Sequence, residues 1–257
     1  MEYISYKMIP SMWGLKKGDV VMVSSDITGL FSSCLEHGEK FDINVFIDEI
    51  IKVIGPEGTL LFPTYSWSFC KGETFDYFKT ACKTGALGTI ALKRKDFKRS
   101  KHPIYSFAVV GKYQDLICGM NNTESWGQDS PFAFFEKIKA KNVIIDCQYN
   151  DCFTFVHYVE QTTGVPYRYH KNFTADYIDE NGDVSQRTYS MYVRDYDLDA
   201  DTDMTEMGKE LEEKGISKVF LINNICYRVV DLAASFKPIE EDIKFNNCKK
   251  ISYFIGQ

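Results

Sequence analysis

Apolar and polar residues follow one another along the first two-thirds of the chain in a pattern that predicts strands and helices in turn. Asp19–Ser24 and Gly58–Pro63 are short apolar runs of the kind that form buried strands. Between them, Phe41–Ile54 carries apolar residues at helical spacing and is closed by Gly55-Pro56. A strand, a helix and a strand at this spacing predict a βαβ unit with parallel pairing.

The same alternation continues to about residue 165. We expect strands at Ser106–Val110 and Asn142–Asp146, with a helix at Pro131–Ile138 between them. Thr154–Thr162 predicts a further helix, because Asn150-Asp151 can cap its start and Gly164 can end it.

The pattern changes after Lys171. Gln186–Val193 alternates in hydrophobicity, and Glu180-Asn-Gly precedes it, which predicts an antiparallel hairpin. A helix at Thr205–Lys214 and a strand at Lys218–Ile222 follow. The predicted fold class is therefore α/β, with a central mostly parallel sheet flanked by helices. We expect residues 1–171 to form the main α/β region, which carries any catalytic site, and residues 172–257 to complete the same domain or form a small, partly antiparallel subdomain.

Composition narrows the class of protein. The 44% hydrophobic and 15% aromatic content is that of a globular protein. The net charge of −6 argues against a nucleic-acid partner, although Lys93–Lys101 is a local basic cluster that suits either a solvated loop or a phosphate clamp. The eight cysteines form no Cys-x-x-Cys pair, so we expect reduced thiols. Because neither a secretory signal nor a long apolar run occurs, the sequence predicts a cytoplasmic protein without a membrane partner.

Of the four histidines, His157 is the strongest candidate for chemistry. It lies early on a predicted helix that follows a predicted strand, the position at which α/β sheets present ligands. Thr154 and Glu160 lie three residues to either side, so each neighbours His157 on the helix surface. Taken alone, this pattern fits a packed structural histidine as well as a general base.

A second candidate is the segment around His102. Arg99, Ser100 and His102 offer donors for a phosphate, a pattern that ordinary loops also show. His37 and His170 are expected to be solvated or packed. The sequence contains no metal-ligand motif, no glycine-rich nucleotide loop and no G-x-S-x-G elbow, so we expect no metal and disfavour a serine hydrolase.

Seven short runs occur together in one order along the chain. They are Val21-Met-Val-Ser-Ser25, Gly55-Pro-Glu-Gly-Thr-Leu-Leu-Phe-Pro-Thr-Tyr65, Phe75-Asp76, Thr84-Gly-Ala-Leu87, Arg99-Ser-Lys-His-Pro103, Gly127-Gln-Asp-Ser-Pro131 and Thr154-Phe-Val-His-Tyr-Val-Glu160. In this order they resemble the aminoglycoside 3-N-acetyltransferase family, the antibiotic N-acetyltransferases, which differ from the GNAT enzymes. The resemblance spans about residues 15–175.

The resemblance implies an N-acetyltransferase that uses acetyl-CoA as co-substrate and transfers the acyl group directly to the amine of a small molecule. His157 would be the general base, supported by Glu160 and Thr154. The residues expected to contact CoA are Ser25, Arg99, Ser100, His102 and Ser106. Those expected to contact the acceptor are Tyr65, Trp67, Asp76 and Arg168.

Several questions stay open at this level. Ser24-Ser25-Asp26 replaces the usual His-Ser-Ser of the family, so the oxyanion donor is either Ser25 or a backbone amide. Residues 164–171 are similar to family members of surface-polysaccharide biosynthesis, which favours a nucleotide-linked amino sugar as the acceptor. An aminoglycoside acceptor with antibiotic resistance and an inactive CoA- or sugar-binding homologue are the alternatives. The acyl chain is undetermined, and a homodimer is considered.

Overall fold

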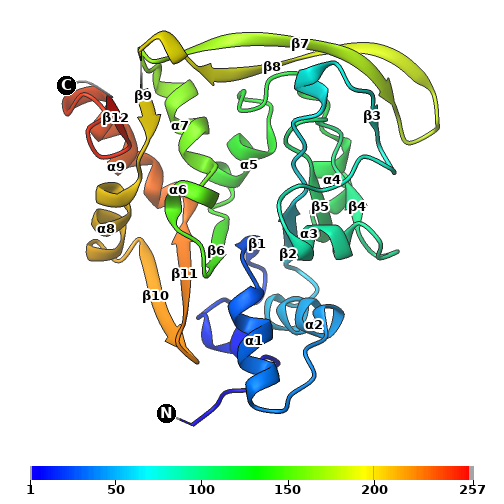
Figure 1. The fold of residues 1–257 in the computed structure, drawn as a ribbon, viewed down its shortest axis with the longest axis vertical. Coiled ribbons are helices and arrows are strands. Elements are labelled where there is room, and N and C mark those ends of the chain that lie inside the picture. Colours follow the sequence, from blue (N-terminus) through cyan, green and yellow to red (C-terminus); the bar gives the residue numbers. More distant parts are fainter. Residues whose placement is uncertain (1, 199, 255–257) are drawn as a thin grey trace.

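The computed structural model describes residues 2–198 and 200–254. Its centre is a seven-stranded sheet with strand order β10-β11-β6-β1-β2-β5-β4 (Figure 1). The strands of this sheet are β1 (Val20–Ser25), β2 (Thr59–Pro63), β4 (Lys98–Arg99), β5 (Phe107–Gly111), β6 (Lys141–Ile145), β10 (Ser217–Ile222) and β11 (Ile225–Asp231). β1 pairs in parallel with both β2 and β6, whereas the strands outside these three join antiparallel.

The predicted α/β class is confirmed, as is the parallel pairing at the centre of the sheet. β1 is buried along almost its whole length because both of its faces are covered. Its side chains alternate between two hydrophobic clusters: Val20 and Met22 belong to one, and Val21 and Val23 to the other. The sheet is therefore the middle of three layers.

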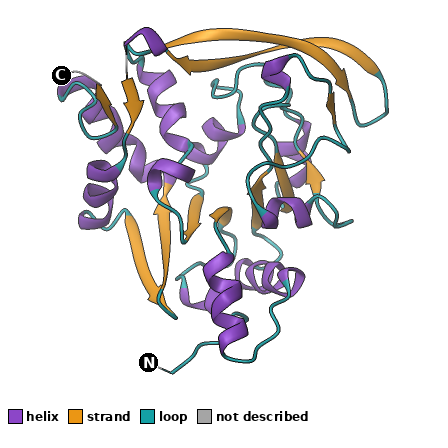
Figure 2. Ribbon diagram, viewed as in Figure 1, coloured by secondary structure: helices purple, strands orange, loops and turns teal. Residues whose placement is uncertain are grey.

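Helices cover the two faces of the sheet (Figure 2). The helices are α1 (Thr28–Glu36), α2 (Ile43–Ile54), α3 (Ala86–Ala91), α4 (Gln114–Gly119), α5 (Pro131–Lys137), α6 (Tyr149–Cys152), α7 (Phe155–Thr163), α8 (Thr205–Glu213) and α9 (Leu232–Phe245), with 3-10 turns η1 (Ile9–Met12), η2 (Phe69–Lys71) and η3 (Tyr196–Leu198). α2 begins where Asp42 accepts hydrogen bonds from two backbone N–H groups, and it ends at Gly55, whose φ is 67°. None of the described helices is long and apolar enough to cross a membrane.

The predicted hairpin is longer than the sequence pattern indicates. β7 (Arg168–Ile178) and β8 (Val184–Arg194) pair antiparallel over eleven residues each and arch across one end of the molecule (Figure 1). β3 (Phe75–Asp76) pairs with the last residues of β7, close to the turn of the hairpin. A short sheet of β9 (Ala200–Thr202) and β12 (Ser252–Phe254) lies beside the opposite end of the hairpin.

The start of the helix that carries His157 differs from the prediction. Asn150 and Asp151 do not cap it: they lie in the separate one-turn helix α6, and α7 begins at Phe155. The break occurs at Phe153, whose ψ of 61° ends the first helix. Gly164 ends α7 with a φ of 83°, as predicted.

Candidate active site

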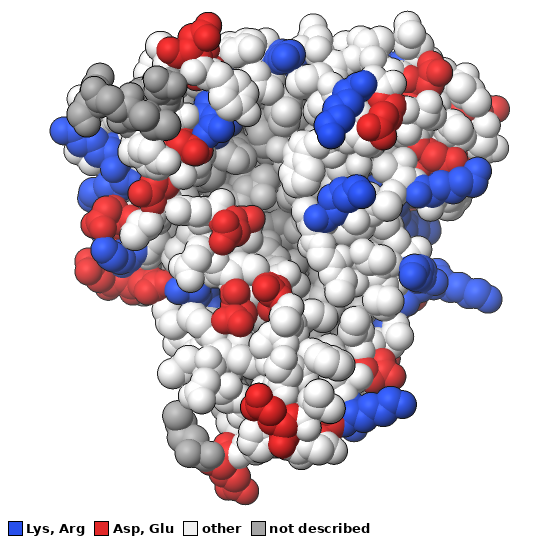
Figure 3. Space-filling view, in the orientation of Figure 1, with Lys and Arg blue, Asp and Glu red and all other residues white. Residues whose placement is uncertain are grey.

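The central strands end at a cavity of about 650 Å3. Ser25 at the end of β1, Pro63 at the end of β2 and Cys147 just after β6 all line it. Figure 3 shows the hollow on this face, with acidic side chains below it and basic ones along its right side. Ligands of α/β sheets bind at the carboxyl ends of the strands, so this cavity is the candidate active site.

His157 reaches the cavity from the first turn of α7, and a buried carboxylate holds its ring. Its Nδ1 lies 2.7 Å from Oε2 of Glu160, a side chain that is fully buried. Because an ionised carboxylate only accepts hydrogen bonds, Nδ1 carries the proton and Nε2 keeps its lone pair. The predicted neighbourhood of His157 and Glu160 is thus observed as a direct contact.

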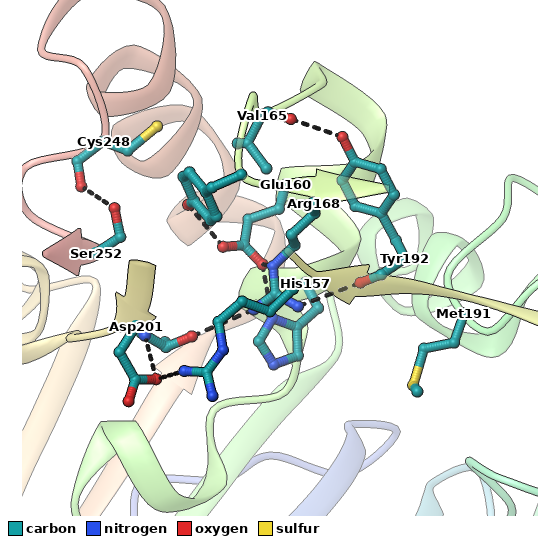
Figure 4. A network of polar contacts seen from close by, with 12 residues as sticks. His157, Glu160, Val165, Arg168, Met191, Tyr192, Asp201, Cys248 and Ser252 are labelled. Atoms are coloured by element: carbon teal, nitrogen blue, oxygen red, sulfur yellow. Dashed lines mark hydrogen bonds and ion pairs between the residues drawn. The ribbon is translucent and has the colours of Figure 1, made fainter. Parts of the chain in front are cut away.

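Glu160 is itself fixed by two further side chains (Figure 4). The Tyr167 hydroxyl donates a hydrogen bond of 2.8 Å to its Oε1. Arg168 Nε lies 2.8 Å from Oε2 and forms an ion pair with it, without the alignment of a hydrogen bond. Other nitrogens of the Arg168 guanidinium donate to the Tyr192 carbonyl and to the Thr202 hydroxyl, each over 3.2 Å. Arg168 therefore positions the carboxylate behind His157.

The charges in this cluster set the protonation state of His157. Burial lowers the pKa of His157 below its ordinary 6.5, and Arg168 lowers it further, while Glu160 acts in the opposite direction. Burial alone would raise the pKa of Glu160, but His157, Arg168 and Tyr167 outweigh it and hold that pKa below 4.5. At pH 7 the cluster consequently contains a neutral imidazole and an ionised carboxylate, as a general base requires.

Aromatic rings form one wall beside His157. The Trp126 ring centroid lies 5.0 Å from that of His157, and Tyr105 lies 4.8 Å from Trp126. Tyr65 packs edge-on against Tyr105 at 4.7 Å, and Trp67 stands at the rim with 42% of its surface exposed. These rings pack beside the imidazole, which also lines the cavity.

Of the residues expected to act, the structure brings Ser25, Tyr65, Trp67, Thr154 and His157 to the cavity wall. The sequence interpretation missed Asp26 and Asp151, which also line it. Asp26 directly follows the strand that ends in Ser25, so its position was readable from the pattern. Asp151 was assigned to a helix cap, and its true place depends on the break between α6 and α7.

Ser100, His102 and Ser106 do not line this cavity, and Arg99 lines a separate one of about 470 Å3, so their expected contact with CoA stays a prediction. The Arg99 guanidinium is only 3% exposed. It donates to the carbonyls of Thr80, at 2.6 Å, and Thr64, at 3.2 Å, and to the Ser106 hydroxyl. These bonds tie the loops after β2 and β3 to β4 and β5, a structural role.

Ser100 and His102 are likewise committed to the backbone. The Ser100 hydroxyl accepts from the N–H of Phe107, and His102 Nδ1 accepts from the N–H of Tyr105. Burial lowers the pKa of His102 to about 3, so the ring is neutral at pH 7. Both side chains are buried, and each holds the backbone between β4 and β5.

Replacing Arg99 with methionine tests this structural role. The apolar side chain would leave the Thr80 carbonyl without its donor and the Thr64 carbonyl with only the Ser106 hydroxyl, so we expect a loss of about 2–4 kcal/mol in unfolding free energy. The affinity for CoA, measured by calorimetry on the folded protein, should stay within about twofold because Arg99 lies off the cavity. A tenfold weaker CoA complex with unchanged thermal stability would contradict this assignment.

Asp76 is also placed away from the cavity. Its carboxylate accepts from the backbone N–H groups of Phe78 and Lys79 and so closes the turn after β3. The expected contact with an acceptor therefore finds no support in this geometry. Among the described residues no group of histidine, cysteine and acidic side chains is arranged to hold a metal ion.

The chain is similar to known proteins in sequence and in fold. The sequence profile described as aminoglycoside 3-N-acetyltransferase matches residues 22–241. No curated protein sequence matches the chain. The structure of aminoglycoside acetyltransferase AAC(3)-Xa is 18% identical over 93% of this chain and 91% of that one, with a TM-score of 0.77.

Two further solved structures share the fold. AAC-IIIb, solved as a binary complex with CoASH, is 16% identical over 95% of this chain and 98% of its own, with a TM-score of 0.78. The YokD protein from Bacillus subtilis is 20% identical over 97% and 96%, with a TM-score of 0.77. The arrangement of layers around the cavity is thus shared across this group of structures.

Proposed function

Because the chain belongs to the aminoglycoside 3-N-acetyltransferase family and is an N-acetyltransferase, we propose that it transfers an acetyl group from acetyl-CoA directly to the amine of an amino sugar, with His157 as general base. The observation that carries this proposal is the 2.7 Å contact of His157 Nδ1 with a fully buried Glu160. It leaves a neutral Nε2 at the cavity, where a proton must be taken from the attacking amine.

The steps follow from the groups around the cavity. The amine nitrogen attacks the thioester carbonyl carbon while His157 Nε2 accepts the amine proton, and Glu160 stabilises the imidazolium that forms. We propose that the Ser25 hydroxyl, at the end of β1 on the cavity wall, donates to the developing oxyanion. The carbon–sulfur bond then breaks, and His157 returns the proton to the departing sulfur. Thr154, one turn before His157, lines the same wall.

The cavity suits an acyl-CoA arm. Its wall near Ser25 carries the hydroxyls of Thr28, Thr84 and Thr154 beside apolar groups, and this mixture matches the uncharged amides and methylenes of pantetheine. AAC-IIIb, which has this fold, was solved with CoASH. We therefore propose acetyl-CoA as co-substrate.

Two acceptor classes fit different parts of the site. Asp26 and Asp151 on the cavity wall favour a cationic amine, and the fold neighbour AAC-VIa was solved with sisomicin bound. Basic side chains beyond His157 favour an anionic acceptor, which is why we place a nucleotide-linked amino sugar for surface glycan synthesis first and an aminoglycoside second.

The test is release of free thiol from acetyl-CoA, with a panel of nucleotide-linked amino sugars and aminoglycosides as acceptors. Acceptor-dependent thiol release together with an acetylated product by mass spectrometry is the expected result. Thiol release with aminoglycosides alone would favour the second acceptor class. A protein that binds CoA yet acetylates no amine would refute the enzymatic proposal.

The pH profile is a second expected result. Since the neutral imidazole is the active form and its pKa lies below 6.5, the limb of kcat/KM that belongs to His157 should lie below that value, beside the limb of the acceptor amine, which is the same for every variant. Arg168 lowers the pKa of His157, so Arg168→Gln should move this acidic limb to higher pH. Steady-state rates between pH 5 and pH 8 measure the shift, and a limb that moves to lower pH would contradict it.

A further inference from the structure

A second cavity, of about 420 Å3, is lined by His157 of α7 and by residues of the β7–β8 hairpin. We call it the hairpin groove, and its characteristic residues are Arg168, Lys171, Arg194, Tyr169, Tyr192 and Tyr196. Three cations line it, whereas no acidic side chain among the described residues does. The first cavity differs, because two acidic side chains, Asp26 and Asp151, and one cation, Lys83, line its wall.

The three cations are not equivalent. Arg168 is engaged with Glu160 behind His157, and its side chain is only 7% exposed. Arg194 forms an ion pair with Asp201, which does not line the groove, and its guanidinium lies 4.8 Å from the Tyr196 ring. Lys171 is exposed, its ammonium lies 5.6 Å from the centre of the Phe173 ring, and it forms no ion pair among the described residues. Lys171 and the Arg194 nitrogens that Asp201 does not engage are therefore the cations available to a ligand.

Large aromatic rings stand beside these cations. Tyr196 is 76% exposed and Tyr169 46% exposed, an unusual degree for rings that border a cavity. A planar base can stack on such a ring, while Lys and Arg bind phosphate oxygens through charge-assisted hydrogen bonds. Cations and open rings together are the chemistry that recognises a nucleoside diphosphate.

The two cavities meet at His157. His157, Trp67, Tyr105 and Thr202 line both of them. An acyl transfer needs the amine within reach of both the thioester carbon and the proton acceptor. If the thioester lies beside Ser25 in the first cavity, as proposed above, the acceptor amine approaches His157 from the hairpin groove.

We infer that the hairpin groove is the subsite for the nucleoside diphosphate of the acceptor, with Lys171 and Arg194 on the phosphates and Tyr196 or Tyr169 under the base. This inference rests on the proposed function and deepens it. It also changes the role of Arg168, which holds Glu160 instead of contacting the acceptor.

Calorimetric titration of the full-length protein with UDP and with inorganic pyrophosphate tests the subsite without needing turnover. We expect UDP to bind, and more tightly than pyrophosphate because of stacking on the ring. Lys171→Ala and Arg194→Ala should each weaken UDP binding by roughly tenfold. Lys237→Ala, which removes the same charge from a side chain 79% exposed on α9, should change it by less than about twofold.

A second titration distinguishes whether the hairpin groove binds the nucleotide of the acceptor or the nucleotide of CoA. Saturating CoA should leave UDP binding unchanged if the groove belongs to the acceptor, and loss of UDP binding under CoA would overturn that assignment. No binding of UDP or pyrophosphate to the wild type, or equal weakening in Lys237→Ala, would overturn the subsite. Either result would leave thiol release with amino sugars intact, so failure here is distinguishable from failure of the acetyltransferase proposal.

Discussion

Replacing His157 with alanine is expected to lower kcat for acetyl transfer by roughly 10²- to 10⁴-fold, the usual contribution of a positioned general base. No other described imidazole lines the cavity, so the proton of the attacking amine would pass to water instead. The measurement is thiol release from acetyl-CoA at saturating acceptor and pH 7.5. CoA binding should persist, because His157 acts on the proton and not on the donor.

His37→Ala is the matched control. His37 is exposed at the end of α1, where its ring stacks on Tyr3 at 4.2 Å, far from the cavity lining. It should keep kcat within about twofold of the wild type, as surface substitutions do. A His157→Ala protein that is folded, binds CoA and still turns over at more than a tenth of the wild-type rate would remove His157 from the mechanism.

The substitution Glu160→Gln is expected to have the second large effect, on both stability and kcat. The substitution leaves Arg168 without its buried counter-ion, and breaking one partner of a buried pair costs about 3 kcal/mol of unfolding free energy. It also removes the charge that stabilises the imidazolium, so kcat should fall by roughly 10²-fold. Because Glu160 raises the pKa of His157, the acidic limb of kcat/KM should move to lower pH, opposite to Arg168→Gln.

Thermal unfolding and a pH-rate profile of the same preparation separate the two effects. Glu206→Gln is the control for charge removal, since its ion pair with Lys209 is exposed on both sides and contributes at most about 1 kcal/mol. If Glu160→Gln matched Glu206→Gln in stability and in pH profile, the contact between Glu160 and His157 would have no role in folding or in catalysis.

The sequence pattern predicted the central sheet well because buried parallel strands have a simple signature. β1 and β2 are nearly continuous apolar runs with a helix of clear period between them, and parallel pairing follows from that spacing. The antiparallel pairing of β2 with β5 has no such local signature. It depends on where the long segment between the two strands returns to the sheet.

The candidate active site also has a part that the sequence predicts and a part that it does not. His157 and Glu160 are three residues apart on one helix, so their contact is a local property that the spacing already indicated. Arg168 and Thr202 reach the same cluster from β7 and β9. The sequence does not show what an arginine such as Arg168 contacts, because a guanidinium can bind either a ligand phosphate or a buried carboxylate.

Arg99 shows most clearly what the sequence does not reveal about a side chain. Its run Arg99-Ser-Lys-His-Pro103 helped to identify the family, yet the guanidinium is spent on the carbonyls of Thr64 and Thr80. A sequence motif alone does not show whether its arginine holds a loop in place or binds a ligand.

The sequence by itself determined the α/β class, the parallel centre and the pairing of His157 with Glu160, since these follow from periodicity along the chain. Tertiary structure alone decided which cations face a cavity and which are buried with a counter-charge, because burial depends on elements distant in sequence.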